Sequence, residues 1–224
     1  MELSLPELQA AVQEIQDREA IRSCLHRYAR GVDRFDRDLL LSAFHPDAVD
    51  DHGKFIGHPA EFADWVFDQH AKTHLSHQHC LFNHACDLDG DIAHAETYFM
   101  FAGMNRQGHP WSVLGGRYLD RFEKRDGVWA IAYRLTLRDW ALIEERVSIE
   151  NQSSFTSTRA SLPVGIRAFM DAGLSPRRDP RDPSYQRPLE ADPERLEAWA
   201  RLDLAQRGRS PFQPATGDGP EEQP

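Results

Sequence analysis

Cysteine, positive charge and long apolar runs are all scarce in this 224-residue chain. Its three cysteines (Cys24, Cys80 and Cys86) are a small, odd set that predicts free thiols rather than a disulfide framework. Lys and Arg number 26 against 36 Asp and Glu, and the formal charge of −10 argues against nucleic acid or an anionic membrane as a partner. No apolar run reaches the roughly 18 residues of a membrane span. We therefore expect a cytoplasmic protein whose acidic, amphipathic first 16 residues are not a signal peptide.

The length suits one well-buried domain with an appendage. We expect the domain over residues 1–148 and a C-terminal extension over residues 149–224. Within the extension, Pro, Arg and Asp dominate residues 175–188, residues 193–208 predict a short amphipathic helix, and residues 212–224 are typical of a disordered tail.

Three helices are expected before any long strand. Residues 5–35 predict the first, because four apolar residues recur on one helical face: Ile21, Leu25, Tyr28 and Val32. Gly31, near its end, suits a left-handed cap or a bend. Residues 36–44 predict a short helix stopped by Pro46. Residues 48–58 predict a pair of strands or a strand with a turn, and residues 59–74 a third helix with Pro59 near its start.

From about residue 75 the apolar pattern changes to the period of two that is typical of strands. Residues 76–88 and 92–104 flank Asp89-Gly90-Asp91, and residues 111–125 and 129–144 flank Asp126-Gly127. Both turns are strong hairpin signals. Helices followed by a meander of long antiparallel strands indicate an α+β fold.

Five of the chain's eleven histidines fall within residues 70–84. On a strand, His77 and His79 would point to one face and could share a metal ion with a third ligand. The spacing singles out none of the candidates for that ligand, which are Asp50, Asp51 and His52, so no metal is predicted. The other histidines of this region are expected to be exposed or lightly buried polar residues: His70, His74, His84 and His94.

An acid–base role needs only a neutral imidazole and a carboxylate that fixes its tautomer. Asp33, at the end of the first helix, is either that carboxylate or a solvated cap. Arg134 alternates with apolar neighbours, so it should face the inside of the sheet while Tyr133 and Leu135 face outward. Such an arginine requires an anionic partner or substrate, or else a salt bridge.

Three strings carry a family resemblance over about residues 10–145: YARGVD at 28–33, HCLFN at 79–83 before DLDGD, and GGRYLDRFEKRDGVWAIAYR at 115–134. Together they resemble the SnoaL-like (polyketide-cyclase-like) family of the nuclear transport factor 2 superfamily. The pattern is similar to that of scytalone dehydratase, hexachlorocyclohexane dehydrochlorinase and bile-acid 7α-dehydratase. The resemblance implies a cone-shaped α+β barrel, in which a curved antiparallel sheet wraps an apolar pocket and N-terminal helices close it.

The resemblance also implies catalytic roles. His79 would be the base and Asp33 its partner, while Arg134 and Tyr28 would stabilise charge on the intermediate or leaving group. Asn83, four residues after His79, would lie in the substrate site, with His77 at its rim. No metal, nucleotide or organic cofactor is implied.

One position departs from the dehydrochlorinase pattern, which has an aromatic residue where this chain has Asp50. The added polarity favours a hydroxylated substrate over a halogenated one. The neighbouring Asp51 and His52 are either a second proton relay or substrate anchor, or a turn at a strand end.

The resulting hypothesis is a cofactor-independent lyase acting on a hydrophobic, hydroxylated aromatic or polycyclic molecule. It would catalyse dehydration, or carbon–carbon cleavage with loss of formaldehyde from a lignin-derived diarylpropane. The alternatives are a ketosteroid-type isomerase and a non-catalytic subunit, such as the small subunit of a ring-hydroxylating dioxygenase. The resemblance favours a homotrimer, in which a C-terminal arm carrying Phe169, Met170 and Trp199 either covers a neighbour's pocket or docks on its own subunit.

Overall fold

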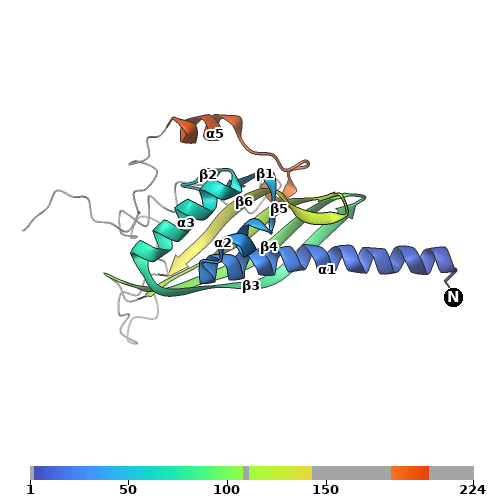
Figure 1. Ribbon diagram of the computed structural model, residues 1–224, viewed down its shortest axis with the longest axis horizontal. Coiled ribbons are helices and arrows are strands. Elements are labelled where there is room, and N and C mark those ends of the chain that lie inside the picture. Colours follow the sequence, from blue (N-terminus) through green and yellow to red (C-terminus); the bar gives the residue numbers. More distant parts are fainter. Residues whose placement is uncertain (1–2, 108–110, 143–182, 202–224) are drawn as a thin grey trace, which may run out of the picture.

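The computed structural model describes residues 3–107, 111–142 and 183–201. Three helices, two short strands and four long strands form the main body (Figure 1), in the order α1 (Leu5–Arg34), α2 (Arg37–Leu41), β1 (Phe44–Asp51), β2 (Ile56–Gly57), α3 (Pro59–Thr73), β3 (His74–Asp89), β4 (Ile92–Asn105), β5 (Trp111–Arg125) and β6 (Val128–Leu142). After it come a 3-10 turn, η3 (Pro183–Tyr185), and the helix α5 (Pro193–Ala200).

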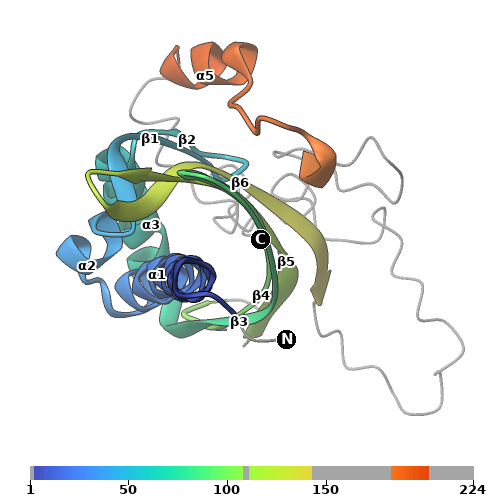
Figure 2. The ribbon, with the colours of Figure 1, turned by 90° about the vertical axis from the view of Figure 1, so that its right-hand side faces the viewer.

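The strands form one six-stranded sheet in the order β2-β1-β6-β5-β4-β3. Strands β3 to β6 make the expected antiparallel meander, and β1 then joins β6 in parallel. Figure 2 shows this sheet curving around α1, with α2 and α3 beside that helix. The predicted α+β class is confirmed, although the curved sheet is unclosed because β2 and β3 remain as its two edges.

The end of α1 differs from the expectation for Gly31. Gly31 is helical, and the left-handed cap is Phe35 (φ 54°). A Cβ on Gly31 would lie 2.6 Å from the backbone nitrogen of Leu40, so glycine is required there for the close approach of α2. The expected stop at Pro46 is also wrong, because α2 ends at Leu41 and Pro46 lies inside β1.

The two faces of the sheet bury different clusters. The concave face packs against α1 and α3 through aromatic residues that include Tyr28, Phe62 and Tyr118. The convex face buries Leu119, Tyr133, Leu135 and Leu137 against Leu189 of the C-terminal segment. The alternation predicted around Arg134 is therefore confirmed, since its two neighbours in sequence belong to the convex cluster.

Helix α5 lies over the β1–β2 end of the sheet (Figure 2). The ring of Trp199 packs edge-on against Phe55 at a centroid distance of 5.0 Å, and Arg195 binds the Asp51 carboxylate and the Gly53 carbonyl oxygen. This part of the extension thus docks on its own subunit. Phe169, Met170, the domain boundary at 148/149 and the predicted tail lie outside the described residues, as does most of residues 201–208 of the predicted helix. Among the residues described, no helix is long and apolar enough to cross a membrane.

Candidate active site

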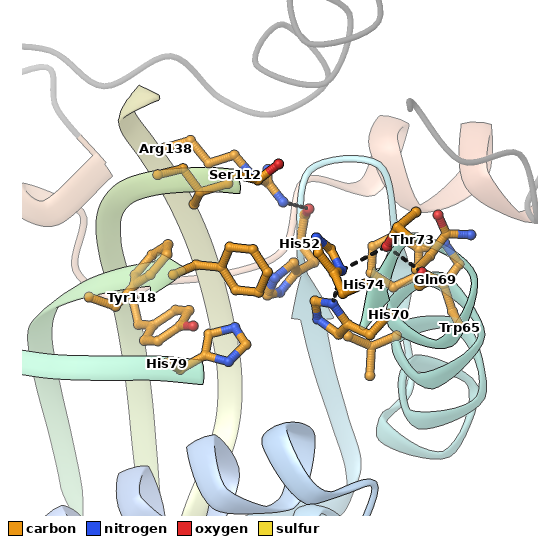
Figure 3. Close-up of a pocket in the computed structure, with 14 residues that line it drawn as sticks. His52, Trp65, Gln69, His70, Thr73, His74, His79, Ser112, Tyr118 and Arg138 are labelled. Atoms are coloured by element: carbon orange, nitrogen blue, oxygen red, sulfur yellow. Dashed lines mark hydrogen bonds between the residues drawn. The ribbon is translucent and has the colours of Figure 1, made fainter. Parts of the chain in front are cut away.

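A pocket with about 690 Å³ of empty space, including its open mouth, lies between the concave face of the sheet and α3 (Figure 3). Its surface is predominantly apolar, and its lining combines aromatic and aliphatic residues with four imidazoles. The members are His52, Trp65, Val66, Gln69, His70, Thr73, His74, His79, Phe99, Phe101, Ser112, Leu114, Tyr118 and Arg138. Such a concave, apolar site with few polar groups is typical of small-molecule binding.

His79 and Asp33 form a pair at this pocket, as the resemblance implied. The His79 imidazole Nδ1 lies 2.7 Å from Asp33 Oδ1, and the His79 backbone N–H donates to Asp33 Oδ2 at 2.9 Å. The side chains are 6 % and 12 % exposed, respectively. Two contacts to one carboxylate fix the ring's orientation, and they leave Nε2 without a hydrogen-bond partner among the residues described. Asp33 is therefore a partner of His79 and not a solvated cap.

A second imidazole–carboxylate pair lies at the end of β1, and its imidazole, that of His52, lines the same pocket while its carboxylate, that of Asp50, lies behind the lining. His52 Nδ1 lies 3.1 Å from Asp50 Oδ1 and 3.1 Å from the hydroxyl oxygen of Thr136. Asp50 is fully buried, and burial raises the pKa of its carboxyl to about 7 although Arg134 and Arg138 oppose the shift. Burial lowers the pKa of His52 well below its usual range, and the positive charge of the nearby Arg138 lowers it further. The His52 imidazole is therefore neutral at pH 7.

Arg134 faces inward but does not line the pocket. Its guanidinium makes two hydrogen bonds to Asp120, and it lies 4.0 Å and 4.1 Å from the ring centroids of Tyr28 and Tyr118. All four side chains are buried. Of these residues only Tyr118 reaches the pocket, so Arg134 and Tyr28 form the layer behind it.

The pocket-lining arginine is Arg138, which sequence reasoning missed. Arg138 lies four residues after Arg134 on β6, so the period of two places it on the same face as Arg134 and Thr136. Its Nη2 donates to the carbonyl oxygen of His52 at 2.8 Å. The same alternation could have identified both Arg138 and Tyr118 from the sequence.

His70 and His74 also line the pocket, so the expectation that they are exposed or lightly buried bystanders is wrong. The Thr73 hydroxyl donates to the Gln69 carbonyl oxygen and lies 2.7 Å from His74 Nδ1, which is 3.2 Å from His70 Nδ1 (Figure 3). Burial lowers the pKa of His74 to about 4 and that of His70 well below its usual range. These imidazoles therefore form a polar but uncharged wall.

Three further predicted residues lie outside the pocket. His77 is not among the lining residues; its ring is stacked on His70 at a centroid distance of 4.0 Å, and its Nε2 lies 3.8 Å from Asp33 Oδ1. Asp51 faces the convex side, where Arg195 binds it, because successive strand residues point to opposite faces. Asn83 is exposed, because the irregularity between Leu81 and His84 shifts the register of β3.

The histidine-rich stretch does not gather into a metal-binding group. Among residues 3–107, 111–142 and 183–201, no group of three or more His, Cys, Asp or Glu side chains is arranged to hold a metal ion.

Comparison with known proteins places the chain in a family. A model of the SnoaL-like domain matches residues 13–135, which include both imidazole–carboxylate pairs. No curated protein matches the chain by sequence.

Several solved structures share the fold at low identity. A type 3 hexachlorocyclohexane dehydrochlorinase from Novosphingobium barchaimii superposes with a TM-score of 0.57 at 19 % identity, covering 61 % of this chain and 96 % of its own. A candidate scytalone dehydratase from Novosphingobium aromaticivorans gives 0.54 at 16 %, covering 62 % and 94 %. A candidate aromatic ring hydroxylase from the same species gives 0.50 at 26 %, covering 55 % and 88 %. Because the family model spans more than half of the sequence, the chain belongs to the SnoaL-like domain family.

Proposed function

We propose that this protein is a cofactor-independent lyase that removes a proton from a hydrophobic, hydroxylated small molecule. The single observation that carries this proposal is the His79–Asp33 contact at the wall of an apolar pocket. Asp33 accepts a hydrogen bond from His79 Nδ1–H, which leaves Nε2 as the proton acceptor. When Nε2 takes the proton, the carboxylate stabilises the imidazolium.

The pocket composition supports a substrate with an aromatic or polycyclic body. Phe99, Phe101 and Leu114 offer apolar surface, while Ser112 and Arg138 offer a few polar contacts. Among the relatives in fold are a dehydrochlorinase and a candidate dehydratase, both names that describe eliminations. We therefore favour dehydration, in which a carbon acid loses its proton to His79 and hydroxide departs from the adjacent carbon.

Loss of formaldehyde is the second outcome that the same base could give. His79 would then take the proton of a hydroxymethyl group, and the carbon–carbon bond would break as the carbonyl forms. A ketosteroid-type isomerisation would use the same proton abstraction without a leaving group. We place these after dehydration, because the pocket that holds His79 is also lined by polar groups that suit a departing hydroxyl, among them His52, Ser112 and Arg138.

A non-catalytic role is the rival from another class. The candidate aromatic ring hydroxylase among the similar structures motivates it, and the same fold can serve either role. A purely structural subunit has no need for a buried imidazole held by two contacts to one carboxylate at a cavity wall. Copurification with a larger iron-dependent subunit would favour this rival.

The test is a screen of hydroxylated aromatic ketones and diarylpropanes, read by new conjugation in the ultraviolet and by released formaldehyde. Wild-type protein is compared with His79→Gln, which removes the base, and with His26→Gln, which removes an exposed imidazole on α1. We expect His79→Gln to lose about 10²–10⁴-fold in rate and His26→Gln to match the wild type. Equal turnover by His79→Gln and wild type would contradict the proposal.

The assembly and location are also proposed. We propose a homotrimer, as the family resemblance suggested, and a cytoplasmic location, as the composition suggested; mass measurement in solution tests the oligomeric state.

A further inference from the structure

The second imidazole–carboxylate pair, His52 and Asp50, has no role in the proton abstraction that we propose for His79. His52 follows β1 and His79 lies on β3, and both rings reach the same pocket (Figure 3). His52 Nδ1 lies 3.1 Å from both Asp50 Oδ1 and Thr136 Oγ1, and its side chain is 12 % exposed. Its Nε2 has no hydrogen-bond partner in the part of the chain that the structure describes.

We propose that His52 is the general acid of the reaction, and that Asp50 supplies it with the proton that it gives to the departing hydroxyl. This inference rests on the proposed lyase function and adds a catalytic residue to it. His79 and His52 would then divide the two proton transfers of a dehydration between them.

The surroundings of Asp50 favour a carboxylic acid over a carboxylate. The side chain is completely buried, and its Oδ2 has no hydrogen-bond partner among the described residues. The nearest strand partner, Arg134, directs its two hydrogen bonds to Asp120 instead. An ionised carboxylate with one oxygen unsatisfied would be costly here, whereas the neutral acid needs only one acceptor for its proton.

The protonation of Asp50 decides what His52 offers to a substrate. A neutral Asp50 donates from Oδ1 to His52 Nδ1, so the ring proton must reside on Nε2, which faces the substrate as a donor. An ionised Asp50 would reverse this arrangement and make Nε2 an acceptor. Other charged or titratable groups also act on this pair: Arg134, Arg138 and Tyr133 on β6, Tyr118 and Asp120 on β5, Asp51 on β1, Tyr28 on α1 and His79 on β3.

The proton balance of the step is complete. His79 Nε2 takes the carbon-bound proton, and the electron pair of that C–H bond forms the C=C bond as the C–O bond breaks. The leaving hydroxyl takes the proton from His52 Nε2 and departs as water, while the Asp50 proton moves to His52 Nδ1. Solvent then carries the proton from His79 to His52 Nε2, and the proton on His52 Nδ1 returns to Asp50, which restores the starting state.

The test compares two leaving groups within each protein variant. The probes are 4-hydroxy-4-phenylbutan-2-one, which must lose hydroxide, and its acetate ester, which loses an anion that needs no proton. Both give the same conjugated enone, which is followed in the ultraviolet. Because the ratio of the two rates is taken within one variant, general damage to folding or binding cancels.

We expect His52→Gln to lower the ratio of hydroxide to acetate elimination by about 10²-fold or more, within the range for general acid catalysis. Asp50→Asn, which keeps the shape and a donor to Nδ1 but has no acidic proton, should lower the ratio in the same direction. An unchanged ratio in His52→Gln would overturn the proposal, whatever its effect on the separate rates.

A third probe separates this inference from the proposed function. The ketone 4-phenylbutan-2-one has no leaving group, and its base-catalysed deuterium exchange next to the carbonyl reports on His79 alone. Loss of exchange in His79→Gln supports the proposed function. Exchange that persists in His79→Gln contradicts the proposed function. The ratio of hydroxide to acetate elimination in His52→Gln still tests the role of His52. A wild-type protein that accelerates none of the three reactions counts against both proposals.

Discussion

Arg134 and Asp120 form a fully buried ion pair, with Nε 2.7 Å from Oδ1 and Nη2 2.8 Å from Oδ2. The pair joins neighbouring positions on β5 and β6, directly behind the wall formed by Tyr118. Arg134 therefore serves as the counter-ion and hydrogen-bond donor of the buried Asp120 carboxylate. Its effect on chemistry would pass through the position of Tyr118.

Asp120→Ala should therefore act mainly on stability. The substitution leaves the Arg134 guanidinium buried without its counter-ion, which typically costs about 3–5 kcal/mol of the free energy of unfolding. Urea denaturation measures this loss. The control is Glu197→Ala, which breaks the exposed contact with Arg201 and should cost about 0–1 kcal/mol. A stable but inactive Asp120→Ala protein would contradict this assignment and favour direct contact of Arg134 with the substrate.

Asp33→Asn should disable His79 without removing it. An asparagine of the same shape can accept from the His79 backbone N–H or from Nδ1–H, but its amide nitrogen cannot replace the second carboxylate oxygen. If the amide donates to Nδ1, the ring proton moves to Nε2 and the base is lost. We expect a rate loss of about 10²–10⁴-fold.

The tautomer of His79 provides a readout for Asp33→Asn that does not depend on a substrate. Imidazole nitrogen chemical shifts should report Nδ1–H in the wild type and an increased share of Nε2–H in the variant. An unchanged tautomer combined with a lost activity would contradict the orienting role of Asp33.

The strand pattern was readable from the sequence, because the long strands turn one face to an aromatic core, and β5 and β6 bury the other face in a second cluster. The pairing of Asp33 with His79 was not readable in this way. The two residues are 46 positions apart, and only the family resemblance suggested their contact. Local periodicity carries no information about which helix end meets which strand.

Asn83 illustrates a second limit. Strict alternation would place it on the same face as His79 and Leu81, but the register shift between Leu81 and His84 turns it to solvent. At the end of β1, by contrast, the alternation of strand residues is kept, so Asp50 is buried on the concave side and Asp51 on the convex side. A sequence of two aspartates does not indicate which one faces the pocket.

The contribution of Asp50 to the free energy of unfolding should fall as the pH rises from about 4 to 7. An aspartate carboxyl in water has a pKa of 3.8, whereas burial raises the pKa of Asp50 in the folded protein to about 7. In this window the folded state therefore binds the proton that the unfolded state has released. Stability decreases with pH wherever the folded state holds more protons. Asp51, whose pKa burial raises to about 6, contributes a smaller loss in the same direction. The buried His52, His70 and His74 contribute in the opposite direction, because their lowered pKa values leave the unfolded state with more bound protons.

Asp50→Asn should remove this contribution. The amide cannot ionise, so the variant should gain melting temperature relative to the wild type at pH 8 and gain little at pH 4. Thermal unfolding at both pH values measures the difference. Asp47→Asn is the matched control, since Asp47 is exposed on the same strand and binds Arg125 at the surface. An equal effect of Asp50→Asn at both pH values would contradict the raised pKa.

Arg195→Leu should loosen the C-terminal helix and destabilise the end of β1. Arg195 is the cation that binds the buried Asp51 carboxylate, and it also donates to the Gly53 carbonyl oxygen beside His52. Without that guanidinium the pKa of Asp51 should rise further, so the loss of stability should grow as the pH increases above 6. Hydrogen exchange of the α5 amides and of residues 50–55 measures the loosening, with Arg201→Leu on the exposed side of the helix end as the control. If residues 50–55 kept their protection while α5 lost its own, the helix would dock on the sheet without supporting the His52 turn.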